Sequence, residues 1–280
     1  MNALEIKGLT KAYRDFRLDS LDLVLPIGCI MGLIGENGAG KSTTIKLILN
    51  TIRRDAGTIT IMGKDNRKNV QLMKEDVGIV LDDVGFPECL TGKQVGKIMR
   101  NTYRNWDNKA YEDYLRKFSV PMDKEFKDFS RGMKMKLGIA VAMSHDPKLL
   151  ILDEATSGLD PVVRDEVVEM LNEFTRDEGH SILISSHIVS DLEKLCDYIA
   201  FLHKGKLLLC EEKDALLEEF GIIHCAPETL RELDASAVKG KKETAYGVEA
   251  IVKRNAVPVG MDVSPIGIEE LFVFMVKEGK

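Results

Sequence analysis

The stretch GLIGENGAGKSTT, residues 32–44, decides the fold. The apolar run CIMGLI leading into it is typical of a buried strand, and STTIKLILN at its end has the periodicity of a helix. Gly35, Gly40, Lys41 and Ser42 keep the spacing GxxxxGK[ST], in which backbone N–H groups around the glycines point into one concavity. The positive end of the following helix adds to this concavity, so the stretch is expected to bind the phosphates of a nucleotide.

The side chains of this loop have separate expected tasks. Lys41 is expected to reach the β- and γ-phosphates, where it assists catalysis, and Ser42 to offer its hydroxyl to Mg²⁺. A nucleotide and Mg²⁺ are therefore expected to bind here. The residues expected to contact the nucleotide in this loop are Gly35, Glu36, Asn37, Gly38, Ala39, Gly40, Lys41, Ser42 and Thr43.

The second half of a nucleotide site is expected at the end of another buried strand. KLLILD, residues 148–153, is a continuous apolar run ending in an acid, as buried parallel strands often are. Asp153 is placed to hold Mg²⁺ through water. Glu154 follows it directly and is expected to face the attacking water as general base.

The remaining pattern predicts an α/β protein with segments of different character. Short apolar alternations in the first thirty residues predict antiparallel strands, and residues 86–145 have helical periodicity without strand signals. Asp160 and Pro161 predict a helix start, with the helix closed at Gly179, and Lys204-Gly205 predicts a hairpin turn. A core domain is expected over residues 1–212, followed by a small α/β appendage over residues 213–280 whose last helix packs back on the core.

Composition sets broad limits on the function. The net charge of −6 gives no reason to expect a general affinity for nucleic acid. The longest uncharged run, Leu23 to Gly35, is too short and too interrupted to cross a bilayer. The five cysteines are scattered without a CxxC pair, which favours reduced thiols in a cytosolic protein that is soluble when isolated.

The segment KDFSRGMKMKLGIA, residues 127–140, begins like a helix but carries a glycine in its first turn. Ser130 is the expected capping residue, and apolar residues from Met133 onward follow one helical face. Gly132 costs about 1 kcal/mol relative to alanine in a helix. A helix start that keeps such a glycine is expected to have a use beyond its own folding.

The ordered motifs, namely the phosphate loop, FSRGM, LLILDEATSGLD and ISSH, resemble the ATP-binding subunits of ATP-binding cassette (ABC) transporters over about residues 1–212. The resemblance implies a P-loop NTPase fold with a RecA-like core, an antiparallel β subdomain and a helical subdomain. It also implies a head-to-tail dimer, in which the helix start contacts the γ-phosphate bound to the other subunit. The residues of this signature are Ser130, Arg131, Gly132 and Met133.

Further roles follow from the same resemblance. Tyr13 matches the aromatic residue that stacks on adenine, Asp160 the loop that couples the two sites of the dimer, and His187 the histidine that contacts the γ-phosphate. Two departures stand out. Asp82 occupies the place of a usual Gln that contacts Mg²⁺-bound water, and Arg131 stands where many members have glycine, where it is expected to pair with phosphate or with a coupling loop.

The SRGM signature and the short tail resemble bacterial subunits that export antimicrobial peptides, drugs or related cargo. The implied partners are a second ATPase subunit, identical or different, and an integral membrane permease, which places the chain on the cytoplasmic face of the cell membrane. Two alternatives stay open. One is a non-transport ABC ATPase, and the other is a degenerate nucleotide-binding subunit paired with an active partner.

Overall fold

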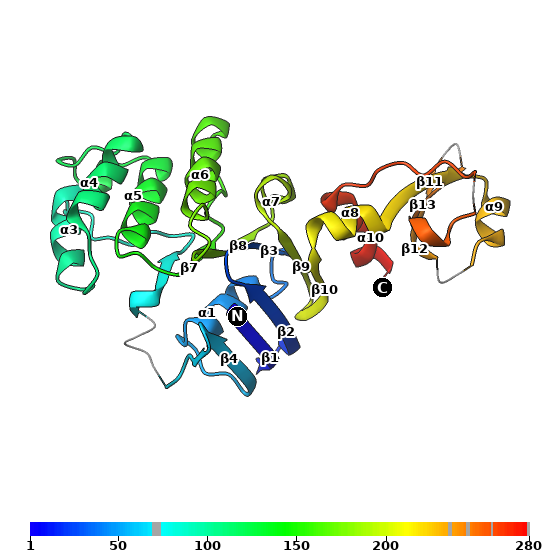
Figure 1. Ribbon diagram of the computed structural model, residues 1–280, viewed down its shortest axis with the longest axis horizontal. Coiled ribbons are helices and arrows are strands. Elements are labelled where there is room, and N and C mark those ends of the chain that lie inside the picture. The colour runs from blue at the N-terminus through cyan, green and yellow to red at the C-terminus, as the bar shows by residue number, and fades with distance from the viewer. Residues whose placement is uncertain (69–73, 235–236, 245–246, 259, 279–280) are drawn as a thin grey trace.

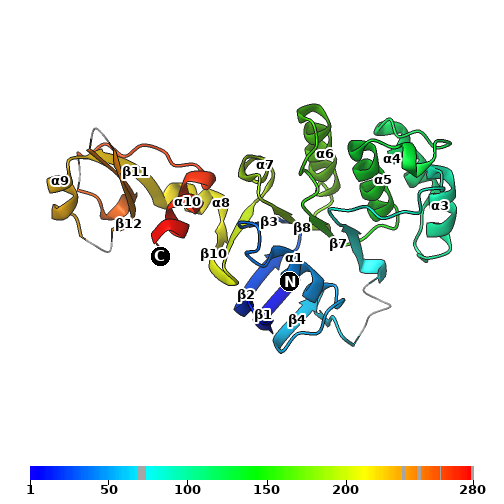
Figure 2. The same cartoon turned by 180° about the vertical axis from the view of Figure 1, so that it is seen from behind.

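The structure is a computed structural model that describes residues 1–280 except 69–73, 235–236, 245–246, 259 and 279–280. The described residues form three sheets, and helices lie along the whole long axis of the molecule (Figure 1). The helices α3 to α5 form one end and the C-terminal sheet forms the other, in both views (Figures 1 and 2). The mixed helix and strand content confirms the expected α/β class.

The central sheet has the order β10-β9-β3-β8-β7-β6. All neighbours in it pair in parallel except the hairpin of β9 and β10. Every residue of β3, β7 and β8 is buried, which explains the almost uninterrupted apolar sequences of β3 and β7. The strands are β3 (Ile30–Ile34), β6 (Val77–Val80), β7 (Leu149–Asp153), β8 (Ser181–Ser186), β9 (Tyr198–His203) and β10 (Lys206–Glu212).

An antiparallel sheet of order β2-β1-β4-β5 covers one side of the central sheet. Its alternating burial, clearest in β2, matches the alternation expected for the first thirty residues. A shared core joins this sheet, α1 and one face of the central sheet through side chains such as Leu23, Ile45 and Ile151. The elements are β1 (Asn2–Ala12), β2 (Arg17–Pro26), α1 (Lys41–Ile48), β4 (Ala56–Ile61) and β5 (Lys64–Asp65).

Residues 86–145, all of which the structure describes, form helices and no strand beyond one isolated bridge. Thr91 and Gln94 make a reciprocal capping box at the start of α3. The elements are α3 (Gly92–Arg100), α4 (Asn108–Lys117), η1 (Phe126–Asp128) and α5 (Arg131–Met143). The helical periodicity of residues 86–145 therefore predicted the structure of this segment.

The helix α6 (Pro161–Phe174) begins as expected but ends earlier. Asp160 caps it by accepting a hydrogen bond from the Val163 N–H at 3.1 Å. The expected end at Gly179 was wrong, because Thr175 is the C-cap and its hydroxyl donates back to the carbonyl of Asn172 at 3.2 Å. The helix α7 (Val189–Leu195) follows β8.

The C-terminal segment forms a three-stranded antiparallel sheet of order β11-β13-β12. The last helix, α10, packs back on the central sheet, where the Phe272 and Phe201 rings lie 5.1 Å apart. The elements are α8 (Lys213–Glu219), β11 (Phe220–Cys225), α9 (Pro227–Glu232), β12 (Val238–Thr244), β13 (Gly247–Lys253), η2 (Arg254–Ala256) and α10 (Ile268–Glu278). In the described part of the chain, no helix has the length and apolar character needed to span a bilayer.

A buried histidine links stability to pH. The His145 ring stacks on Tyr103 with centroids 4.0 Å apart, and its Nε2 lies 3.3 Å from the Val77 carbonyl oxygen. Burial lowers the pKa of His145, so the unfolded chain takes up this proton first as the pH falls. Above the ordinary pKa of about 6.5, the buried neutral His145 therefore contributes its full share to the free energy of unfolding. As the pH falls below this value, that contribution is lost progressively.

We expect the free energy of unfolding to fall with pH below about 6.5, by at most about 1.4 kcal/mol per pH unit for this group. Chemical denaturation across the range from about pH 5 to about pH 7.5 measures the slope. His145→Gln should flatten the slope, whereas His224→Gln, an exposed position on β11, should not. Equal slopes for wild type and His145→Gln would contradict the assignment.

Candidate nucleotide site

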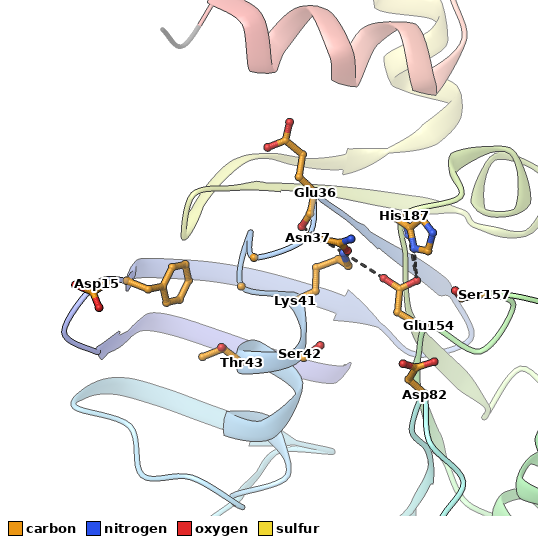
Figure 3. Close-up of a pocket in the computed structure, with 13 residues that line it drawn as sticks. Asp15, Glu36, Asn37, Lys41, Ser42, Thr43, Asp82, Glu154, Ser157 and His187 are labelled. Carbon is orange, nitrogen blue, oxygen red and sulfur yellow. Dashed lines mark hydrogen bonds and ion pairs between the residues drawn. The ribbon is translucent and has the colours of Figure 1, made fainter.

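A cavity of about 760 Å³ opens at the carboxyl ends of the parallel strands, beside the start of α1 (Figure 3). Ligands of open α/β sheets bind at this edge. The residues that line the cavity are Asp15, Phe16, Glu36, Asn37, Gly38, Gly40, Lys41, Ser42, Thr43, Asp82, Glu154, Ser157 and His187.

The glycine loop connects β3 to α1, as the sequence predicts. Gly40 is the N-cap of α1 with φ 115°, a conformation that favours glycine, and a Cβ there would lie 3.0 Å from the Phe16 ring. No side chain caps α1, so the N–H groups of its first turn are free to bind an anion.

Lys41 points across the mouth of this loop. Its side chain is only 6% exposed, and its Nζ donates to the Gly35 carbonyl at 2.7 Å. The same Nζ lies 3.2 Å from Glu154 Oε1. The buried ammonium of Lys41 and the partly exposed carboxylate of Glu154 therefore form an ion pair beside the glycine loop.

Glu154 directly follows β7 and has a strained backbone conformation. Its φ of 54° is unusual for a residue other than glycine, and its N–H donates to the Ser185 carbonyl at 3.0 Å. The second carboxylate oxygen, Oε2, lies 2.6 Å from His187 Nδ1 (Figure 3). The structure thus brings together Lys41, Glu154 and His187, which the sequence places far apart.

Asp153 lies behind this group at the end of β7. It is buried, and its Oδ1 accepts a hydrogen bond of 2.5 Å from the Ser185 hydroxyl. Among the described residues, no three His, Cys, Asp or Glu side chains are grouped to hold a metal by themselves. Mg²⁺ usually keeps waters and substrate phosphates among its ligands, so the hydroxyl of Ser42 and the carboxylates of Asp153 and Asp82 are donors of the right chemistry.

Asp82 follows β6 and lines the cavity, whereas the neighbouring Asp83 does not. Its side chain is 58% exposed, and its Oδ1 lies 3.0 Å from Arg131 Nη2. The two residues that depart from the family pattern are therefore partners in this structure, a pairing that their separation in sequence did not suggest.

The aromatic residue that lines the cavity is not the one expected from the sequence. Tyr13 is 49% exposed and does not line the cavity, although Lys11 Nζ lies 5.5 Å from its ring centroid. Phe16, in the same turn between β1 and β2, lines it instead, and its ring lies 6.4 Å from that of Tyr13. Three lining residues were not predicted from the sequence, namely Phe16, Asp15 and Ser157. A second aromatic residue three positions after Tyr13 was the available signal.

The signature residues lie away from the cavity of their own chain. Ser130 is exposed and caps α5 by accepting from the Met133 N–H at 3.2 Å. None of the four described residues 130–133 lines the cavity. Gly132 is buried rather than open, because a Cβ there would lie 3.0 Å from Val163 Cγ1 on α6. A larger residue at this position would therefore press against Val163 within the same chain.

His203 is a further feature that the sequence did not single out. It is buried at the end of β9, and its Nδ1 lies 3.5 Å from Glu36 Oε2 in the glycine loop. His180 stacks on Phe174 with centroids 4.4 Å apart, and His224 is exposed.

A glycine loop between a buried strand and a helix, at the carboxyl edge of a mostly parallel sheet, defines a P-loop nucleotide-binding protein. The family model described as ABC transporter matches residues 18–157. The bacitracin transport ATP-binding protein BcrA of Enterococcus faecalis is 35% identical over 208 residues, which cover 73% of this chain and 68% of that protein.

Two further similarities agree. The lantibiotic transport ATP-binding protein SrtF of Streptococcus pyogenes is 35% identical over 215 residues, covering 75% of this chain and 91% of that protein. A solved ATP-binding subunit of an ABC transporter has a TM-score of 0.70 and 30% identity, covering 76% of this chain and 91% of that chain. The chain belongs to the ABC transporter family. It is an ATP-binding subunit of such a transporter and hydrolyses ATP.

Proposed function

We propose that two copies of this chain close on two ATP molecules, and that each ATP lies between the cavity of one copy and the signature of the other. One observation carries the proposal. Lys41, Glu154 and His187 converge on the cavity, whereas Ser130 is exposed, caps a helix and lies outside it. Because each chain carries both halves, two identical copies suffice for two complete sites.

Each residue then has a definite task. Lys41 and the glycine loop bind the phosphates, and Ser42, Asp153 and Asp82 hold Mg²⁺, partly through water. Mg²⁺ supplies neutralisation of phosphate charge when it is bound. Lys41 would exchange the Glu154 carboxylate for phosphate oxygens, which leaves Oε1 free to accept a proton from the attacking water. His187 fixes the other oxygen of Glu154 and contacts the γ-phosphate.

The rest of the site is completed by contacts at its edges. The aromatic turn that contains Tyr13 and Phe16 stacks on adenine. In the partner, Ser130, Arg131, Gly132 and Met133 present the positive start of α5 to the γ-phosphate. Asp160 couples the two sites across the dimer.

The domains and partners are proposed as follows. Residues 1–212 form the ATPase domain, with a helical subdomain near residues 86–145, and residues 213–280 form an accessory domain. An integral membrane permease binds the pair at the cytoplasmic face of the membrane, which the names of two transport ATP-binding relatives support. Closure of the pair on ATP shifts the permease between conformations, and nucleic acid is not a partner.

The cargo is an exported antimicrobial peptide. The names of two relatives, a bacitracin transport and a lantibiotic transport ATP-binding protein, support this class. We expect cells that lack the chain to become several-fold more sensitive to bacitracin or to a lantibiotic. Wild type should restore resistance, whereas Lys41→Ala should not, because the phosphates lose their buried cation.

The growth-inhibiting concentration of each peptide measures this effect, with equal expression of both variants checked by immunoblot. Lys127→Ala, which removes an exposed cation of η1 outside the cavity, is the matched control and should restore resistance. Unchanged sensitivity to both peptides in cells without the chain would contradict the cargo class. Co-purification from native membranes then identifies the permease.

A further inference from the structure

The start of the signature helix is joined to the ATP cavity of its own chain by one arginine. Arg131 is the first residue of α5, and its Nη2 lies 3.0 Å from Oδ1 of Asp82 in the cavity wall. The two side chains are 54% and 58% exposed. The pair lies beside the cavity, in a second hollow of about 380 Å³ that Asp82 and Arg131 share with Phe129 and Lys134.

The same guanidinium also covers the loop that leads to α6. Gly158 has φ 67°, and a Cβ built on it would lie 2.6 Å from Arg131 Nη1 and 2.8 Å from Arg131 Cζ. The planar group therefore rests against the backbone of this loop, next to Ser157, which lines the cavity. One side chain thus contacts two cavity loops that are far apart in the sequence.

An arginine at this position needs a reason. A cation in the first turn of a helix opposes the helix dipole, and no acidic residue of the first turn of α5 compensates it. The Asp82 carboxylate supplies the compensation from another segment. An exposed ion pair alone contributes little to the stability of the fold. Stability therefore does not account for an arginine at position 131.

We propose that Arg131 is a positioning residue for the ATP cavity of its own subunit. It fixes the Asp82 loop and the Gly158 loop in one arrangement, so that nucleotide in the cavity and the signature that faces the partner are mechanically joined. This inference rests on the proposed function for the meaning of the cavity. We call the contacts of Arg131 with the Asp82 loop and the Gly158 loop the joint. The joint is a property of the single chain and can be measured without ATP or metal.

Hydrogen exchange followed by mass spectrometry, at short labelling times and without nucleotide, tests the joint. We expect Arg131→Gln to speed exchange in residues 81–86 and 155–159 by roughly 2- to 5-fold, the range that an exposed ion pair allows. Turnover should fall by at least a similar factor, because Arg131 also belongs to the signature that faces the γ-phosphate of the partner.

Two further variants separate the contacts of Arg131. Arg131→Lys keeps a cation for Asp82 but lacks the planar group over Gly158, so it should restore slow exchange in 81–86 and not in 155–159. Asp82→Asn should speed exchange in 81–86, and combining it with Arg131→Gln should add little there. The matched control is Arg116→Gln on α4, because Arg116 pairs with Asp113 at 2.9 Å and lines neither of the two hollows.

The outcomes are distinguishable. Unchanged exchange in both loops for Arg131→Gln, or additive effects with Asp82→Asn, would overturn the inference even if the wild-type chain hydrolyses ATP normally. A wild-type chain that hydrolyses no ATP would instead overturn the proposed function, and the exchange result would still decide whether the joint exists. Since both side chains are exposed, neither substitution is expected to unfold the chain.

Discussion

Glu154→Gln should bind ATP and hydrolyse it roughly 10²- to 10⁴-fold more slowly than wild type, the usual contribution of a general base. The amide keeps the size of the side chain and its place beside His187 but cannot accept a proton from water. It also ends the ion pair with Lys41, so binding of ATP should not weaken. Phosphate release measures turnover, and gel filtration with ATP should show an accumulated dimer.

Glu178→Gln is a suitable control for this result, because Glu178 is an exposed glutamate in the turn after α6 and does not line the cavity. It should behave as wild type in both measurements. Turnover by Glu154→Gln at the wild-type rate would remove Glu154 from the reaction. Loss of ATP binding would show instead that the carboxylate is needed to hold Lys41 in place.

Ser130→Arg should leave ATP binding by the single chain unchanged while turnover falls by roughly 10²-fold or more, as when a preorganised anion contact is removed. The long cation fills the space that the phosphate of the partner must enter, but it lies outside the chain's own cavity. Titration with a fluorescent ATP analogue measures binding, and phosphate release at several protein concentrations measures dimer-dependent turnover.

The substitution also removes a helix cap, which costs about 1 kcal/mol. Asp107→Ala is the matched control, because Asp107 caps α4 by accepting from the Lys109 and Ala110 N–H groups. It loses a cap of the same kind in the same helical segment and should keep turnover. If Ser130→Arg also abolished binding by the single chain, Ser130 would belong to the cavity of its own subunit.

Local sequence patterns predicted the parts of the site that a short segment forms by itself. The glycine loop, the acid after a buried apolar strand and the Ser130 cap each depend on neighbours in the chain, and each appears where expected. The helical segment 86–145 follows from periodicity in the same way. The close approach of Glu154 to His187 required only that two adjacent parallel strands end at the same edge.

Contacts between distant segments were beyond the reach of these patterns. The reason for Gly132 lies in Val163 on another helix, and the partner of Arg131 lies 49 positions away. Spacing in the sequence does not decide which ring of the turn, Tyr13 or Phe16, lines the cavity. The expected end of α6 at Gly179 was wrong, because Thr175 is already its C-cap.

The central claim is that each reaction site is shared by two chains, and a mixing experiment tests it most directly. Lys41→Ala and Ser130→Arg should each be inactive alone, because each pair of identical chains lacks the same half of both sites. An equimolar mixture should recover roughly a quarter of wild-type turnover, since half of the pairs are mixed and each of these has one complete site of two. A mixture as inactive as its components would contradict the claim.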